Sequence, residues 1–78
     1  MKVWMRPMGT GCKIRVDSRD DANTLGAQLT DQGATCTDPV SVAGTFGCVF
    51  YVSKPTEPVQ VQGLLKAIPE VELMLDPA

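Results

Sequence analysis

Residues 12–33, CKIRVDSRDDANTLGAQLTDQG, change from the pattern of a strand to the pattern of a helix near residue 18. In residues 12–17 apolar and charged side chains alternate, which is typical of a strand with one buried face. We therefore expect Ile14 and Val16 to point into the core and the charged residues between them to point outward.

The helix that follows carries both a start signal and a stop signal. Ser18 stands three residues before Asp21, so its hydroxyl can accept a hydrogen bond from the first turn, where acidic residues are also favoured. Gly33 can adopt the left-handed conformation that ends many helices. The pattern predicts a helix over residues 19–32 with a buried stripe of Ala22, Leu25 and Leu29.

The middle of the chain predicts a β-hairpin. Residues 46–53 are the most strand-like stretch, and the more apolar of their two faces consists of Phe46, Cys48, Phe50 and Val52. The preceding strand is interrupted by Pro39, which cannot donate to a ladder, so that strand belongs at an edge or begins after the proline. Val40 and Val42 are its expected inward pair, and residues 43–45 supply the turn.

The last third of the chain predicts a helix and a closing strand. Thr56 is the expected N-cap, Pro58 is tolerated in the first turn, and Pro69 ends the helix. The apolar stripe of this helix is Val61, Leu64, Leu65 and Ile68. Residues 71–76 alternate again, with an inward set of Val71, Leu73 and Leu75.

This order of elements predicts an α+β fold of one domain, residues 1–78. The expected architecture is a ferredoxin-like βαββαβ two-layer sandwich over residues 12–78, with a four-stranded antiparallel sheet and two helices on one face. Residues 1–11 are expected to form either an extra strand, joined to the first by a turn at residues 8–11, or a loose arm. Trp4, Met5 and Met8 could pack over an edge of the core or contact a partner.

Composition narrows the classes of partner. The chain is 44% hydrophobic and 21% charged without a long apolar run, so no membrane contact is expected. Arg6 and Pro7 interrupt the amino-terminal residues before a signal peptide develops, and the expected compartment is the cytoplasm. A net charge of −2 and a pI near 4.8 make nucleic acid an unexpected partner.

The chain offers no catalytic constellation, because it has no histidine to act as a general base. Its acidic cluster, Asp17, Asp20 and Asp21, is typical of a solvated helix start, so we expect no enzyme activity, no bound metal and no cofactor. The three cysteines, Cys12, Cys36 and Cys48, lack a Cys-x-x-Cys spacing and suit buried reduced thiols. A disulfide, and metal binding or reactivity, are the alternatives for them.

The face of the sheet without helices is the candidate binding surface. If the alternation above is right, its residues are Lys13, Arg15, Val49, Tyr51 and Met74, with Asp17, Glu72 and Asp76 around them. An aromatic and two aliphatic side chains among charges make a plausible dimer or partner surface. Half-solvated antiparallel sheets also occur without any partner.

Residues 12–76 resemble the ACT domain, a small regulatory module. The resemblance lies in the strand ending at Asp17, the helix ending at residues 32–34, the hairpin, and the closing run over residues 64–71. It implies pairing through sheets and binding of an amino acid at the first strand–helix junction, here Asp17, Asp20 and Asn23. That junction lacks the glycine through which the family's ligand approaches the backbone.

Residues 44–51 also resemble the third strand of the RNA-recognition motif, with matches at Phe46, Gly47, Val49 and Tyr51. They depart from that pattern at Gly44, Thr45 and Cys48. This resemblance implies binding of a single-stranded nucleic acid.

Three functions follow as hypotheses. The first is a non-catalytic binding or regulatory module that forms a homodimer or docks a protein partner through the open sheet face or an edge strand. The second is a sensor of a small, amino-acid-like molecule at the strand–helix junction. The third is a nucleic-acid binder.

Overall fold

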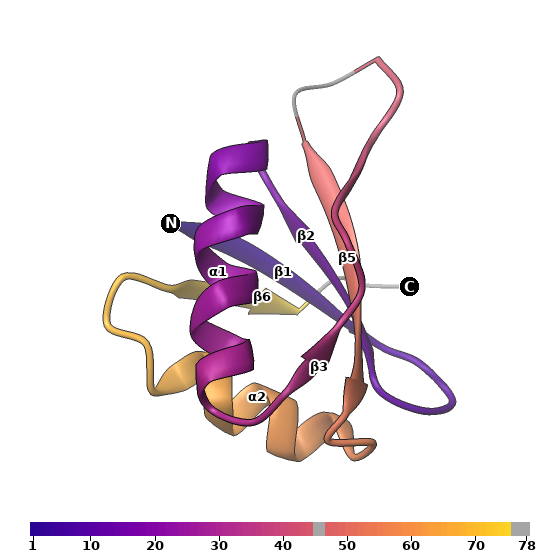
Figure 1. Cartoon of the computed structure of the whole chain (residues 1–78), viewed down its shortest axis with the longest axis vertical. Coiled ribbons are helices and arrows are strands. Elements are labelled where there is room, and N and C mark those ends of the chain that lie inside the picture. Colours follow the sequence, from indigo (N-terminus) through magenta and orange to yellow (C-terminus); the bar gives the residue numbers. More distant parts are fainter. Residues whose placement is uncertain (45–46, 76–78) are drawn as a thin grey trace.

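The computed structural model of the chain describes residues 1–44 and 47–75 and shows an α+β fold with two helices and an open, mixed sheet of six strands (Figure 1). The elements are β1 Lys2–Pro7, β2 Cys12–Val16, α1 Arg19–Asp31, β3 Thr35–Cys36, β4 Val40–Ser41, β5 Cys48–Lys54, α2 Pro58–Lys66 and β6 Glu72–Leu75.

The prediction of a four-stranded, wholly antiparallel sheet is wrong. The strand order is β3-β5-β2-β1-β6, and β4 also pairs with β5. β1 pairs antiparallel with β2 and parallel with β6, so it lies between two strands that the predicted topology placed side by side. The extra strand is the reason the sheet is mixed, because β6 now has β1 as its neighbour instead of β2.

β1 is therefore an integral strand rather than a loose arm. Its side chains alternate, and Val3 and Met5 are buried at 0% and 1% exposure. The turn to β2 closes at Gly11, which has a φ of +75° and whose amide donates to the carbonyl of Thr56 at 2.8 Å. A Cβ at Gly11 would overlap the carbonyl oxygen of Val52, so glycine alone fits there.

The prediction for α1 is confirmed at both ends. Ser18 is the N-cap, and its hydroxyl accepts a hydrogen bond of 3.1 Å from the amide of Asp21. Gly33 follows the C-cap with a φ of +93°, and the amide of Ala34 bonds back to the carbonyl of Leu29 at 3.0 Å. The buried residues of the helix are the expected ones, Ala22, Leu25 and Leu29.

α2 begins one residue later than expected. Its N-cap is Glu57, not Thr56, and no side chain bonds to the free amides of the first turn. Pro58 at the start lacks an amide hydrogen, which reduces the number of amides that need a cap. The helix ends at Lys66, before Pro69, while Val61, Leu65 and Ile68 are buried.

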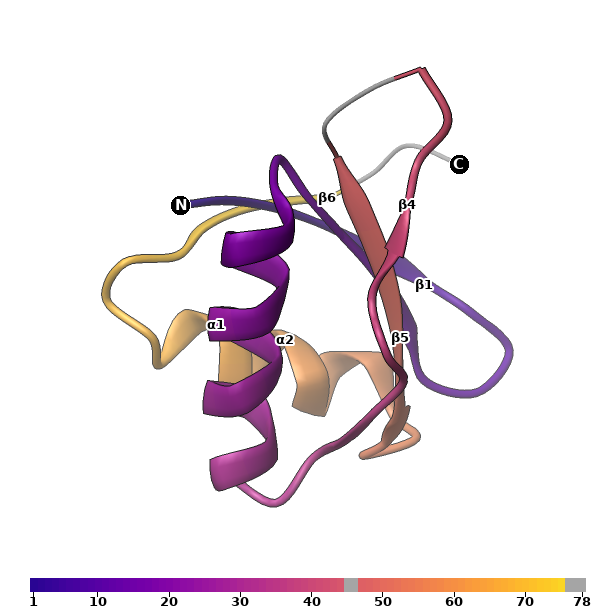
Figure 2. The ribbon, with the colours of Figure 1, turned by 45° about the horizontal axis from the view of Figure 1, so that its top comes forward.

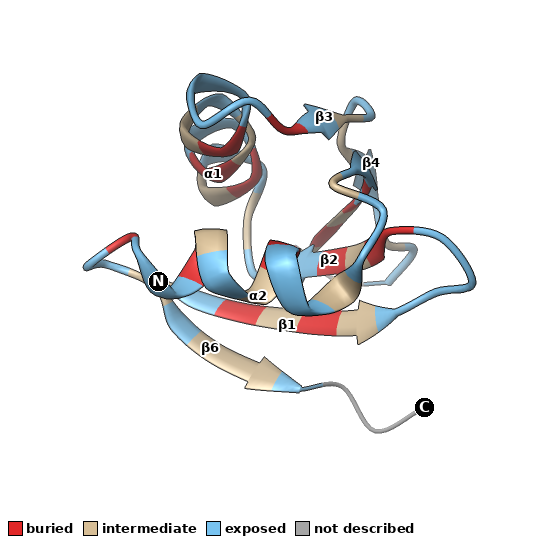
Figure 3. Ribbon diagram, turned by 90° about the horizontal axis from the view of Figure 1, so that it is seen from below, coloured by how far each residue is buried: buried red, intermediate tan, exposed pale blue. Residues whose placement is uncertain are grey.

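Both helices lie on the same side of the ribbons of β1 and β6, and they run crosswise to each other (Figure 3). The core fills the space between this helical layer and the sheet. Its fully buried members on the strands include Ile14 and Val16 of β2 and Cys48, Phe50 and Val52 of β5, as the alternation predicted. Phe46 lies outside the described residues. Among the residues described, no polar or charged residue is buried in the core.

The edge strand next to β5 is broken into two short pieces by Asp38 and Pro39 (Figure 2). The amide of Thr37 still donates to the carbonyl of Tyr51, at 2.9 Å, between the two pieces. The prediction that Val40 points inward is wrong, because Val40 pairs with Val49 and is 64% exposed. Directly opposed residues share a face, and Val49 faces away from the helices.

Candidate binding surface on the open face of the sheet

The side chains that point away from the helices form a continuous surface across five strands. We call this surface the open face; it consists of Lys2, Trp4, Arg6, Lys13, Arg15, Val40, Val49, Tyr51, Glu72 and Met74. Strand alternation places them there, because their neighbours along β1, β2 and β5 are buried in the core.

Cross-strand pairing arranges eight residues of the open face in two rows, and Lys2 pairs with Glu72 beyond them. The first row, the mixed row, crosses β6, β1, β2, β5 and β4 and consists of Met74, Trp4, Arg15, Val49 and Val40. The second, the cationic row, consists of Arg6, Lys13 and Tyr51. The two rows are two residues apart along each strand, about 7 Å.

Arg15 lies over the ring of Trp4, with its guanidinium carbon 4.3 Å from the ring centroid. A cation held over an indole face at this distance is stabilised by about 0.5–1 kcal/mol at an exposed site. The contact covers one face of the half-buried Trp4 ring and fixes the direction of the guanidinium. Arg15 itself stays exposed, so its remaining N–H donors are accessible.

Positive charge is concentrated on the open face. Four of the seven Lys and Arg residues of the chain lie there, Lys2, Arg6, Lys13 and Arg15, beside one carboxylate, Glu72. The ten residues of the open face carry +3 while the whole chain carries −2, so the other residues of the sequence, which include Asp17 directly after β2 and Asp76 outside the described residues, sum to −5. Within the part of the chain that the structure describes, no ion pair neutralises these four cations.

The five residues predicted for this surface, Lys13, Arg15, Val49, Tyr51 and Met74, do share one face. Asp17 is exposed directly after β2, whereas Asp76 lies outside the described residues. Sequence reasoning missed the contributions of β1 and β4 to the face, which are Lys2, Trp4, Arg6 and Val40. The available signal was the alternation of buried Val3 and Met5 with their neighbours, since it separates Trp4 from Met5 onto opposite faces.

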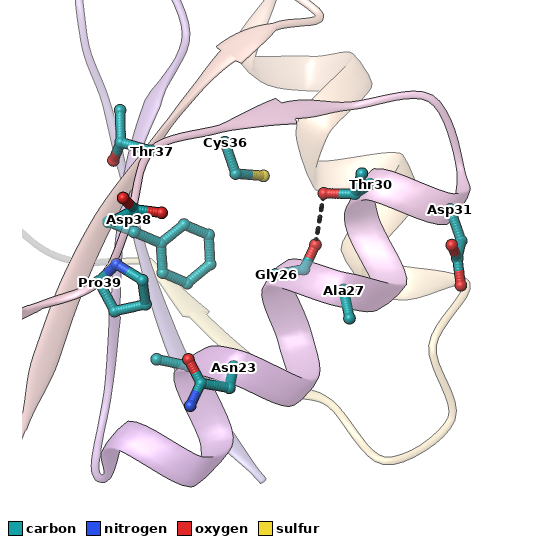
Figure 4. Close-up of a pocket in the computed structure, with 11 residues that line it drawn as sticks. Asn23, Gly26, Ala27, Thr30, Asp31, Cys36, Thr37, Asp38 and Pro39 are labelled. Atoms are coloured by element: carbon teal, nitrogen blue, oxygen red, sulfur yellow. Dashed lines mark hydrogen bonds between the residues drawn. The ribbon is translucent and has the colours of Figure 1, made fainter.

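The second predicted site does not form one cluster. Asn23 lines a hollow of about 370 Å³ beside α1, while Asp17 and Asp20 are exposed and do not line it. One wall of the hollow is α1 and the other is the segment of residues 36–39 (Figure 4). Its chemistry comes from Asn23, Thr30, Asp31, Cys36, Asp38 and the ring of Phe50.

The cysteines are free thiols, with Cys12 and Cys48 buried and Cys36 half-buried. Burial raises the pKa of the Cys12 thiol. Burial also raises the pKa of the Cys36 thiol, and a hydrogen bond with Thr30 offsets part of that rise. A raised pKa lowers the fraction of reactive thiolate at neutral pH, so these environments do not activate either residue as a nucleophile.

Two other features are absent from the described residues. No group of three or more His, Cys, Asp or Glu side chains among them is placed to hold a metal ion. No helix in residues 1–44 or 47–75 is long and apolar enough to cross a membrane.

Comparison with known proteins found no relative. The chain matches no model of a protein family, no curated protein and no solved structure.

Proposed function

We propose that this chain is a non-catalytic module that docks a protein partner on the open face of its sheet. The observation that carries the proposal is the combination of Trp4, Tyr51 and exposed aliphatic groups with four cations on one surface, none of which forms an ion pair with another described residue. Tyr51 is 43% exposed and Val40 64% exposed, so both offer area to a partner. Aromatic residues and arginine are enriched at protein interfaces.

We class the fold, within the same proposal, as a variant of the ferredoxin-like sandwich. From β2 to β6 the chain runs strand, helix, strand, strand, helix, strand, with β3 and β4 counted as one interrupted strand. β1 is inserted between the first and last strands of that order. The insertion widens the open face by one strand and supplies two of its four cations, Arg6 and Lys2.

Homodimerisation through the open face is less well supported than docking of a different protein. Stacking two copies face to face would bring two +3 surfaces together. Like charges facing each other at an interface are unfavourable, and buried ones cost several kcal/mol. Light scattering at micromolar concentration should therefore report a monomer, whereas a dimer lost in a Tyr51→Glu variant would support self-pairing instead.

Photo-crosslinking in the cells that express the protein tests the docking function. The photoreactive residue p-benzoylphenylalanine replaces Tyr51 on the open face in one variant and Thr24, exposed on α1, in a matched control. We expect the Tyr51 variant to crosslink a defined protein that the Thr24 variant does not. If the Tyr51 variant crosslinks nothing beyond the control, the docking function is wrong.

One observation favours a second function, the sensing of a small molecule. The hollow beside α1 is lined by polar side chains, among them Asn23 and Asp38, and by Phe50. Gly26 lines it, and a Cβ there would meet no atom within 4 Å, so Gly26→Leu should fill the space without a backbone clash. Binding only to the folded state raises stability.

A thermal-shift screen with amino acids and nucleotides tests the sensor. We expect a ligand to raise the melting temperature of the native chain and of a Thr24→Leu control, but not of the Gly26→Leu variant. A shift that persists in Gly26→Leu would place the ligand elsewhere, and the absence of any hit would count against the sensor.

A further inference from the structure

We propose that the open face binds an acidic segment of its protein partner, a segment in which carboxylates are interspersed with apolar side chains. This inference rests on the proposed docking function and names its partner chemistry. Its basis is the concentration of four of the chain's seven Lys and Arg residues on the open face, which carries +3 in a chain of net charge −2.

The two rows of the open face would contact two different kinds of partner side chain. In the mixed row, Met74 and Val49 flank the Trp4–Arg15 pair on either side and offer apolar contact. In the cationic row, Arg6 and Lys13 are directly paired, and like charges side by side are unfavourable until an anion lies between them. A carboxylate at that point would bond to both cations, and charge-assisted bonds of this kind are stronger than neutral ones.

The same features disfavour a nucleic acid. One face of the Trp4 ring is already covered by Arg15, and Val49, Val40 and Met74 have no planar surface, so Tyr51 is the one ring of the open face that stays uncovered for a base to stack on. The molecule measures 30 × 25 × 21 Å, so a long polyanion would extend past the face, and the residues outside the face are net acidic. A short acidic segment would end within the open face. Because charges interact strongly only within about 8 Å at physiological salt, carboxylates elsewhere on the molecule would not repel it.

Fluorescence anisotropy with three short labelled probes tests the inference on the full chain. The probes are a peptide of alternating glutamate and leucine, its counterpart with glutamine for every glutamate, and an oligouridylate. We expect the glutamate peptide to bind at least about tenfold more tightly than either of the others, the difference made by one strong charge contact. Its affinity should fall as salt rises from low to physiological concentration.

Charge-reversal variants locate the binding. Arg6→Glu combined with Lys13→Glu should weaken the glutamate peptide by more than about tenfold, because two favourable contacts become repulsive. Lys54→Glu combined with Lys66→Glu is the matched control, with the same change in net charge at exposed positions off the open face. Arg6→Gln combined with Lys13→Gln should cause an intermediate loss of affinity for the glutamate peptide. This pair replaces the charge-reversal pair if circular dichroism shows that charge reversal disturbs folding.

The outcomes separate this inference from the docking function. If the glutamine peptide binds as tightly as the glutamate peptide, or if both charge-reversal pairs weaken binding equally, the acidic partner is wrong while docking stands. Preferential binding of the oligouridylate overturns both in favour of a nucleic-acid partner. A Tyr51 crosslink to a protein, with no probe bound, retains docking and rejects the acidic segment.

Discussion

Individual residues carry much of the specificity of this small fold, and Gly11 is the clearest example. It combines a positive φ with a close approach to the backbone of Val52, and it joins the β1–β2 turn to Thr56 through a hydrogen bond. Gly9 lies in the same turn, yet a Cβ there would meet nothing within 4 Å. The two glycines of one turn therefore differ in what they tolerate.

We expect Gly11→Ala to lower the free energy of unfolding by more than about 2 kcal/mol, because it adds backbone strain to a steric overlap. Gly9→Ala should change it by less than about 0.5 kcal/mol, the usual range for a surface substitution. Urea denaturation of both variants measures the difference. Equal effects would show that the turn backbone can move away from Val52.

The thiols give a second expectation at this scale, concerning pH. Burial raises the pKa of Cys36 above its ordinary value, so its thiolate forms only at a higher pH than that of an exposed cysteine. Near pH 8 the rate at which iodoacetamide alkylates Cys36 should be lower than its rate with a cysteine peptide. The rate for Cys36 should increase as the pH is raised above 8. Cys12, which is buried, should react only in denaturant. Rapid labelling of Cys36 at pH 7 would contradict this account.

The same shift affects stability with a definite sign. A thiol whose pKa is raised by folding stabilises the folded state fully below its unfolded pKa, near 8.5, and loses that contribution as pH rises through the folded value. Cys12 and Cys36 should therefore destabilise the chain in the alkaline range and leave stability near pH 7 unaffected.

At the scale of elements, the two helices begin in different ways. Ser18 caps α1 with its hydroxyl, whereas the start of α2 has no side-chain cap. We expect Ser18→Ala to cost about 1 kcal/mol of stability, the usual value of an N-cap. Thr56→Ala, the matched control before α2, should have almost no effect, and thermal melts of the two variants would show it. A comparable loss in both would mean that Thr56 does act as a cap.

Local signals predicted most of the elements because their information lies within a few residues. Ser18 and Gly33 bound α1 by their own chemistry, and Phe50 and Val52 set the inward face of β5 by simple alternation. The orientation of Val40 could not be obtained in this way. Its strand is two residues long, so its face is decided by the ladder to Val49 and not by its own hydrophobicity.

At the scale of the whole molecule, the place of β1 could not be predicted from local pattern. Val3 and Met5 supply only two inward positions before Pro7, so the segment was expected to be either an extra strand or a loose arm. Its central place depends on pairing with β6, at the far end of the chain. Half of the open face was predicted, namely its members on β2, β5 and β6, whereas the residues of β1 were missed because that strand was expected only as an alternative to a loose arm.

Removal of residues 1–11 tests that central place. The deletion takes Val3 and Met5 from the core and leaves β2 and β6 without the strand between them, so we expect no cooperative thermal transition. Two point variants refine the test without shortening the chain. Met5→Asp buries an unpaired charge and should unfold the chain, whereas Arg6→Asp, on the open face, should melt cooperatively. A truncated chain that still melts cooperatively would show that residues 1–11 are an arm that the fold does not need.

The contact between the two ends of the described chain affects when the sheet can form during synthesis. The amino group of Met1 donates to the carbonyl of Glu70 at 2.8 Å, across 69 positions of sequence, and the parallel ladder of β1 and β6 begins beside it. During synthesis β1 leaves the ribosome before its parallel partner β6, because β6 lies about 70 residues later in the sequence. Pairing at such long separation is slow because the chain between must first be ordered. Until then the nascent chain exposes one edge of β1, and an unpaired strand edge is prone to pair with other chains.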